Sequence, residues 1–332
     1  MGHEGIVIAA DLHTSQEETR LIEGIAFHSI PLSVTSFFSF WKKAQLILQE
    51  FRPELLLASS DSYFGYLGMR LAKQLNIPFI FDVYDNYTAF GTNKIPGMKS
   101  LFFKTVRNAD LVITAGKSLH DFLKQNAKSI KSVENGYAPT LFHPIPQNEA
   151  KSKLGILAKE KVIGYFGSLE PDLGIEDLIE AVQLLKHEFP DIHLMIAGRN
   201  KLHIDFKTHN IDYRGFLPQE KIPLLINACD VVVIPYTPSR MKQWCNACKI
   251  AEYVACNRPV VVTDIADHAS IFSTVPQSLC EPGNPSSMAN AIRAQLISPK
   301  ILSNDGNHTW KKLTDKLYAE MESLLKLSNK PY

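Results

Sequence analysis

One short segment combines a cation and a carboxylate at helical spacing. Lys249 and Glu252 are three residues apart, so on a helix they share one face. A lysine in the first turn of a helix is unfavourable beside the positive end of the helix dipole, unless an anion binds there. A diphosphate would supply that anion, and Glu252 would accept hydrogen bonds from two adjacent sugar hydroxyls, as a ribose offers. An ordinary surface ion pair explains the same spacing equally well.

A second candidate site follows the apolar run 161–166. Gly167 ends this run, and a glycine there allows a ligand to approach the backbone closely. The segment has neither the Gly-x-Gly-x-x-Gly dinucleotide fingerprint nor a Walker lysine, which argues against a dehydrogenase and a P-loop enzyme. Taken alone, Gly167 is equally well explained as a turn residue.

These residues need a scaffold, and the hydrophobic pattern predicts one. Short apolar runs bounded by turn residues alternate with amphipathic stretches, which is typical of parallel sheets with helices on both faces. The predicted strands cover 5–10, 54–59, 78–83, 110–114, 161–166, 192–197, 230–235 and 259–263. The predicted helices cover 62–75, 97–108, 175–189, 218–229, 248–256 and 309–327.

The chain length favours two domains. A single core rarely grows beyond roughly 250 to 300 residues, and this chain has 332. The turn-rich span 144–153 separates the two series of predicted elements, and one long amphipathic helix closes the chain. We therefore expect a first domain over 1–146, a second over 147–307 and a C-terminal helix within 308–332.

Composition excludes several classes of protein. The 35 basic and 34 acidic residues leave a formal charge of +1, so there is no global field to attract nucleic acid. The five cysteines include Cys245 and Cys248 but lack metal-site spacing, which favours free thiols in a reducing compartment and no metal site. No apolar segment approaches the ~20 residues that cross a bilayer. We expect a cytoplasmic protein.

One region is unusual because aromatic residues precede a basic pair. Such a cluster can mark a helix that lies on a membrane surface, which here would be the inner face of the cell membrane. Packing of the rings on the sheet is the favoured alternative, since large aromatic side chains usually belong to cores. The residues concerned are Phe37, Phe38, Phe40, Trp41, Lys42 and Lys43.

Taken together, these motifs resemble the retaining glycosyltransferases of the GT-B fold, specifically glycosyltransferase family 4. The second half is similar to the donor-binding half of that family through 162–169 with 174–181, 194–198, 213–216, 228–235, and 249–253 running into 258–264. The first half is similar to the acceptor half through 52–55, 109–114, and 133–136 with 141–144. The closing helix, with Trp310, resembles the family's C-terminal segment, which crosses back onto the first domain.

The resemblance implies an α/β fold of two Rossmann-like, doubly wound domains with an interdomain cleft. Residues 1–146 would form the acceptor side, 147–307 would bind the nucleotide-sugar donor, and 308–332 would cross back. It also implies transfer of a sugar from a nucleotide diphosphate to a saccharide or lipid-linked acceptor, in cell-surface polysaccharide or glycoconjugate synthesis. No metal or other cofactor and no nucleic acid would take part.

Carried over by position, the resemblance assigns roles to individual residues. Lys249 would bind the diphosphate, Glu252 the ribose, and Asp85 the transferred sugar, and these three are the predicted catalytic residues. The loop 214–217 would hold the base. The predicted donor contacts are Gly167, Ser168, Arg199, Gly215, Phe216, Asn246, Lys249 and Glu252.

The sequence also departs from the family pattern. Basic residues common in the family after the first loop are replaced by Ser168 and Leu173, so diphosphate stabilisation is expected to be weaker, with Arg199, Arg240 and Lys242 as candidate substitute cations. Two further family positions differ, with Tyr84 in place of histidine and Trp244 in place of a glutamate.

The largest departure is at the beginning of the sequence. The start resembles the family's second strand, so the usual first strand and its glycine loop are expected to be absent. These departures leave open a catalytically impaired GT-B scaffold or binding protein. A sugar-nucleotide epimerase ranks last, because its acidic and histidine constellation is not apparent.

Overall fold

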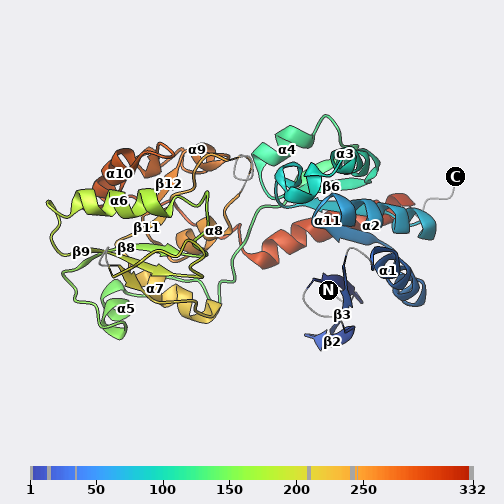
Figure 1. The fold of residues 1–332 in the computed structure, drawn as a ribbon, viewed down its shortest axis with the longest axis horizontal. Helices are drawn as coiled ribbons and strands as arrows, with labels where there is room; N and C mark the ends of the chain where they lie inside the picture. Colours follow the sequence, from blue (N-terminus) through green and yellow to red (C-terminus); the bar gives the residue numbers. More distant parts are fainter. Residues whose placement is uncertain are drawn as a thin grey trace.

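The computed structural model describes residues 3–12, 16–33, 36–207, 211–239, 244 and 246–328. Within them the chain forms two α/β halves side by side, and helix α11 (Trp310–Ser328) returns from the second half to the first (Figure 1). All strand pairs are parallel except that between β2 (Glu18–Ile22) and β3 (Ile25–Pro31). The predicted α/β class is confirmed.

The second half is built on one continuous sheet of six strands, in the order β10-β9-β8-β11-β12-β13. Their bounds are β8 (Lys161–Phe166), β9 (Ile192–Ala197), β10 (Asp212–Tyr213), β11 (Val231–Ile234), β12 (Val260–Thr263) and β13 (Leu279–Cys280). β11 and β12 are buried along their whole length, because unbroken valine-rich runs suit strands that are covered on both faces. The helices of this half are α5 (Gln147–Lys153), α6 (Ile175–Leu185), α7 (Ile222–Ala228), α8 (Cys248–Ala255), α9 (His268–Ile271) and α10 (Pro285–Ile297).

The first half contains two separate sheets among the described residues. A three-stranded sheet has the order β1-β3-β2, and a four-stranded sheet has the order β4-β5-β6-β7. The remaining bounds are β1 (Ile6–Asp11), β4 (Leu56–Ser59), β5 (Phe79–Val83), β6 (Leu111–Thr114) and β7 (Ile130–Ser132). The helices are α1 (Phe37–Phe51), α2 (Ser62–Leu75), α3 (Met98–Asn108) and α4 (Lys117–Leu123). The sequence did not predict the β2–β3 pair or the separation of the sheets.

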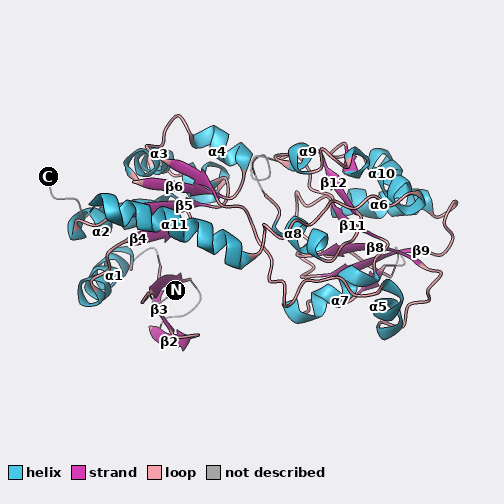
Figure 2. Cartoon of the chain, turned by 180° about the vertical axis from the view of Figure 1, so that it is seen from behind, coloured by secondary structure: helices cyan, strands magenta, loops and turns pink. Residues whose placement is uncertain are grey.

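Helix α11 covers one face of the four-stranded sheet, while α2 and α3 lie on the other side of it (Figure 2). Leu317, Met321 and Leu324 pack on a small buried cluster of the sheet, formed by Ile80, Leu111 and Ile113. The segment that leads into α11 is joined to the first half by backbone hydrogen bonds from Tyr137 N to His308 O and from Trp310 N to Tyr137 O. The C-terminal segment therefore fastens the two halves together.

Several helix boundaries follow from local chemistry. α2 begins where the Asp61 carboxylate accepts a hydrogen bond from Tyr63 N, and it ends at Asn76 in the left-handed conformation. This helix was predicted with the observed bounds. The helix predicted over 218–229 is instead a 3-10 turn, Gln219–Lys221, followed by α7 from Ile222. Pro223 at the start of α7 suits the first helical turn, which explains why the α-helix starts there.

The aromatic and basic cluster lies on α1. Phe40 is buried, and Phe37 and Trp41 pack against the same core, which agrees with the favoured packing interpretation. Phe38 is 84% exposed and Lys42 also faces solvent, while Lys43 pairs with Glu17. Membrane contact stays a prediction for this surface. None of the helices in the described part of the chain combines the length and apolarity needed to span a bilayer.

Candidate functional site

The N-terminus of α8 meets the loop after β8, and Lys249 lies at the junction. The Lys249 ammonium donates to Tyr165 Oη at 3.2 Å and lies over the Tyr165 ring, 4.3 Å from its centre. A Cβ atom at Gly167 would collide with this ammonium, so the amine rests directly on the glycine backbone. In the described part of the chain, no side chain caps the first turn of α8, and that turn contains no acidic residue. The positive helix end and the amine thus converge on the loop.

Two glycines make this junction possible. Gly167 ends β8 with φ at +154°, and its N–H donates to Ala197 O at 2.8 Å. A Cβ atom at Gly198 would collide with the Gly167 carbonyl, so the loops after β8 and β9 pack backbone against backbone. Ser168 follows half-buried, and its carbonyl accepts a hydrogen bond from Tyr165 Oη at 2.8 Å. Larger residues at either glycine would separate the loops that border Lys249.

Glu252 lies one turn beyond Lys249 on α8. Gln219 Nε2 donates to its carboxylate at 3.3 Å. Burial raises the pKa of Glu252, while the Gln219 hydrogen bond and the charge of Lys249 act in the opposite direction. A partly desolvated carboxylate that accepts from one side-chain donor among the described residues would gain from two hydroxyl donors, which is what a ribose diol supplies.

Arg199 and Phe216 form the outer edge of this region. The Arg199 guanidinium lies over the Phe216 ring at 4.5 Å, and the ring is 66% exposed. The backbone links their loops, because Gly198 N donates to Gly215 O at 2.8 Å. The structure therefore brings Arg199, Gly215 and Phe216 together, and an exposed ring beside a cation is a surface on which a flat base can stack. Arg214 is held elsewhere by Asp212, at 2.7 Å.

Asp85 comes from the first half, just after β5. Its carboxylate accepts a hydrogen bond from Asn86 N at 2.7 Å. Partial desolvation, with the charges of Glu252 and Asp85, raises the pKa of the Cys248 thiol. Asp85 is thus near enough to act electrostatically on the first residue of α8. Its role toward the transferred sugar stays a prediction.

Asn246 lies where the two halves touch. Its Nδ2 donates to Ala115 O at 3.0 Å, and its carbonyl accepts from Asn135 Nδ2 at 2.7 Å. Next to it, the buried Asp267 accepts from both the N–H and the hydroxyl of Ser118, at 2.8 and 2.5 Å. Sequence analysis missed the Ser118–Asp267 contact, and no spacing signal would have revealed a pair 149 residues apart.

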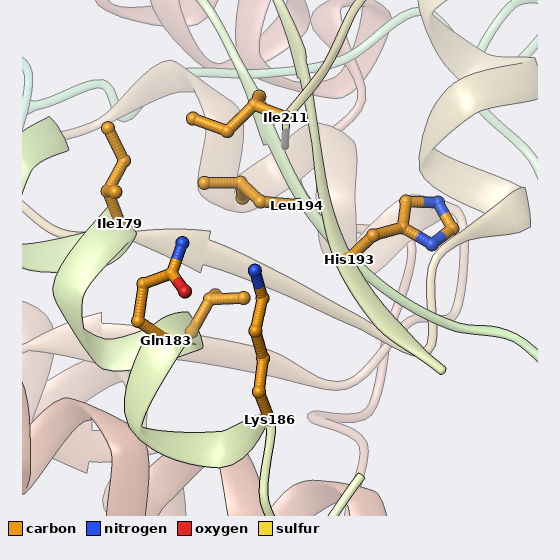
Figure 3. Close-up of a pocket in the computed structure, with 7 residues that line it drawn as sticks. Ile179, Gln183, Lys186, His193, Leu194 and Ile211 are labelled. Atoms are coloured by element: carbon orange, nitrogen blue, oxygen red, sulfur yellow. The ribbon is translucent and has the colours of Figure 1, made fainter. Parts of the chain in front are cut away.

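Other candidate features contribute little to this site. Arg240, Lys242 and Cys245 lie outside the described residues, and Cys248 is a free thiol. Within the described ranges, no group of three or more His, Cys, Asp or Glu side chains is placed to hold a metal. A hollow of about 10 Å³ lies between α6 and β9, where Lys186 and Gln183 point toward Leu194 (Figure 3). That volume accommodates about one water molecule, so the hollow is not a ligand site.

Comparisons with known proteins find similarity to glycosyltransferases. Residues 160–297 match the family described as "Glycosyl transferases group 1". The chain is 21% identical over 260 residues to TuaC of Bacillus subtilis (strain 168), named as a teichuronic acid biosynthesis glycosyltransferase, covering 75% of this chain and 64% of TuaC. It is 22% identical over 195 residues to a GDP-mannose-dependent alpha-mannosyltransferase of Mycobacterium tuberculosis (strain CDC 1551 / Oshkosh), covering 53% and 50%. The chain thus spans about half to two thirds of these relatives' length.

Among solved structures, HepE of Anabaena in complex with UDP-glucose is similar with a TM-score of 0.75 and 18% identity. The similarity covers 97% of this chain and all of that one. The predicted fold, GT-B with two Rossmann-like domains, is confirmed by this similarity. The family match and the shared fold support a GT-B glycosyltransferase. Assignment to family 4 and retention at the anomeric carbon stay predictions.

Proposed function

We propose that this protein transfers a sugar from a nucleotide diphosphate donor to a saccharide or lipid-linked acceptor, with retention, in the synthesis of a cell-surface polysaccharide or glycoconjugate. The observation that carries the proposal is the position of Lys249, whose amine rests on Gly167 at the uncapped start of α8. The name of TuaC and the UDP-glucose complex of HepE support this class of reaction.

The chemical demand is to stabilise the departing nucleotide diphosphate while an oxocarbenium-like sugar forms. In our proposal Lys249 and the N–H groups at the start of α8 bind the diphosphate, which then takes the proton of the incoming hydroxyl. Glu252 binds the ribose diol, and the base stacks near Arg199 and Phe216. Asp85 holds the sugar from the opposite side of the cleft.

In this proposal Lys249 and the N-terminal end of α8 stabilise the charge of the departing diphosphate, so the reaction needs no metal ion. Chelation with EDTA then leaves the rate of transfer unchanged, whereas a loss that Mg²⁺ or Mn²⁺ restores would contradict this part. For a lipid-linked acceptor, the exposed Phe38 and Lys42 on α1 would contact the inner face of the membrane.

The test combines binding and turnover. Calorimetry with UDP, GDP and ADP identifies the base, and a panel of nucleotide sugars then reports transfer and hydrolysis. Lys249→Ala should lower turnover about 100-fold, because it removes one preorganised cation from the leaving group. Lys300→Ala, at an exposed lysine of the same half, is the matched control and should change neither nucleotide binding nor turnover.

Each alternative gives a different result. A catalytically impaired scaffold shows no turnover with any donor, and an epimerase converts the donor sugar without an acceptor. Unchanged turnover in folded Lys249→Ala would contradict the proposed role of Lys249 in binding the diphosphate. Circular dichroism of the variant establishes that the fold is intact.

A further inference from the structure

The amine of Lys249 contacts more than the glycine backbone on which it rests. It lies over the rings of Tyr165 and Tyr236, at 4.3 and 5.5 Å from the ring centres. Both distances are within the roughly 6 Å at which an ammonium is attracted to the face of an aromatic ring. One lysine side chain therefore contacts two tyrosines as well as the backbone of Gly167.

The two tyrosines come from neighbouring strands of the sheet. Tyr165 is the next-to-last residue of β8, and Tyr236 follows the end of β11 by two residues. β8 and β11 pair in parallel, so both rings reach the amine from the same edge of the sheet. Tyr165 is completely buried and Tyr236 is 6% exposed, so packing fixes both rings. Lys249, by contrast, carries its charge on a flexible four-carbon stem.

The hydroxyl of Tyr165 has a defined direction. Lys249 Nζ donates to Tyr165 Oη at 3.2 Å, and Tyr165 Oη donates to the Ser168 carbonyl at 2.8 Å. An ammonium can only donate, so the hydroxyl accepts from the lysine and gives its own proton to the carbonyl. Burial raises the pKa of Tyr165, and the charge of Glu170 acts in the same direction, so the hydroxyl keeps this proton at neutral pH. The tyrosine thereby links the amine to the loop after β8.

The side chains of that loop add no positive charge. Residues 167–173 contain no lysine or arginine, and they include the acidic Glu170 and Asp172. Glu170 pairs with Lys201 at 2.8 Å. A diphosphate beside this loop would therefore depend on Lys249 and on the N–H groups at the start of α8. Ordering a long side chain costs conformational entropy, and a side chain that is already held costs less to order when the ligand binds.

We propose that Tyr165 is a positioning residue for Lys249, and that its hydroxyl and ring, together with the ring of Tyr236, hold the amine in place before a diphosphate binds. The inference rests on the proposed function, because it concerns the same diphosphate site. Tyr165 is completely buried and acts through Lys249, without touching the donor itself. Without its hydroxyl the amine loses one of its contacts, and the affinity for a diphosphate falls.

The test measures the dissociation constants of UDP, GDP and ADP, and of the matching nucleoside monophosphates, by calorimetry on the whole chain. For the diphosphate that binds most tightly, Tyr165→Phe should raise Kd about fivefold, because a hydrogen bond to a charged group is lost. The Kd of its monophosphate should change less than about twofold, because the effect acts through the amine at the diphosphate. Circular dichroism establishes that the variant is folded.

Tyr213→Phe is the matched control. Tyr213 Oη donates to the carbonyl of Gly198, just after β9, at 2.7 Å, and among the described residues this hydroxyl contacts no lysine. The control therefore removes the same kind of hydrogen bond from a neighbouring loop without affecting the amine of Lys249. It should change the Kd values of the diphosphate and the monophosphate by the same factor.

A double-mutant cycle separates a positioning role from a structural one. In the Lys249→Ala background, Tyr165→Phe should change the diphosphate Kd less than about twofold, because the group that it positions is absent. An equal loss in both backgrounds, or an equal loss for diphosphate and monophosphate, would overturn the proposal and make Tyr165 a structural support of the loop. No loss in Tyr165→Phe would overturn it as well. Tyr236→Phe keeps the second ring and should bind the diphosphate more tightly than Tyr236→Leu, whereas equal binding would contradict the part assigned to that ring.

Failure of this inference is distinguishable from failure of the proposed function. If Lys249→Ala weakens diphosphate binding and Tyr165→Phe does not, only the positioning role is wrong. If Lys249→Ala leaves the Kd unchanged, or if the unmodified protein binds none of the three diphosphates, the diphosphate site itself is wrong and the positioning role is overturned with it.

Discussion

The two halves of the molecule differ in the continuity of their sheets. The second half has one continuous sheet, in which β11 and β12 are fully buried. The first half has two sheets, and the strands that face the gap are only half-buried. Burial of apolar surface is the main favourable contribution to folding, so the second half should be the more stable.

The two halves also position their site residues in different ways. Gly167 and Lys249 belong to the continuous sheet and its helix, where backbone loops touch and tolerate little change. Asp85 follows β5, which is buried between the helices on both faces and lies away from the uncovered edge. An interrupted sheet can therefore still hold the loop that carries Asp85.

The largest expected effect is the loss of unfolding free energy when a core side chain is truncated. Ile163→Ala in β8 should cost about 2–5 kcal/mol of unfolding free energy, because the side chain is completely buried. Leu57→Ala in β4 should cost about 1 kcal/mol, because that side chain is 38% exposed and already borders a cavity. Urea unfolding followed by circular dichroism measures both. Similar costs would break the comparison.

Much of the fold could be predicted from local pattern. The bounds of β8, β9 and α2 were predicted as observed, since buried strands and a capped helix carry strong local signals. β2 was missed because its sequence, Glu18–Ile22, is exposed throughout and shows little apolar content. The sequence analysis expected a missing first strand but did not predict that the sheet is interrupted between β1 and β4, because strand order depends on contacts that no local pattern encodes.

The site was predictable to a different extent. The spacing of Lys249 and Glu252 indicated a shared helix face, and the resemblance supplied Gly167 as a neighbour. The cation over Phe216 required the structure, because Arg199 and Phe216 lie on separate loops. The roles of all these residues stay predictions until they are tested by substitution.

A second prediction concerns the contact between the halves. Asp267→Ala removes the acceptor of two Ser118 hydrogen bonds and should cost about 1–3 kcal/mol of the coupling between the halves. Unfolding of the two halves should then separate into two transitions, which differential scanning calorimetry detects. Asp264→Ala, at an exposed carboxylate three residues earlier, is the control and should leave the profile unchanged. Unchanged cooperativity in Asp267→Ala would show that the remaining contacts, α11 and the hydrogen bonds of Asn246 among them, are enough to couple the halves.

The smallest effect expected is a pH dependence of the first half. His308, at the start of the crossing segment, lies 2.5 Å from Glu134, whose hydrogen bond raises the pKa of His308 above 6.5, while His308 lowers the pKa of Glu134 below 4.5. The histidine contribution is complete below pH 6.5 and is lost as pH rises through the raised value. The glutamate contribution is present above pH 4.5 and is lost as pH falls through the lowered value.

Stability from this pair should therefore be greatest between about pH 4.5 and 6.5. Because both side chains are more than one third exposed, the effect should stay below about 1 kcal/mol. Thermal unfolding against pH, compared with Glu134→Gln, measures it. Glu320→Gln removes the Lys131–Glu320 pair between β7 and α11, which has no histidine, and should leave the loss of stability above pH 6.5 in place. If Glu134→Gln retains that loss too, another group is responsible and the crossing segment is held by its backbone bonds and apolar contacts alone.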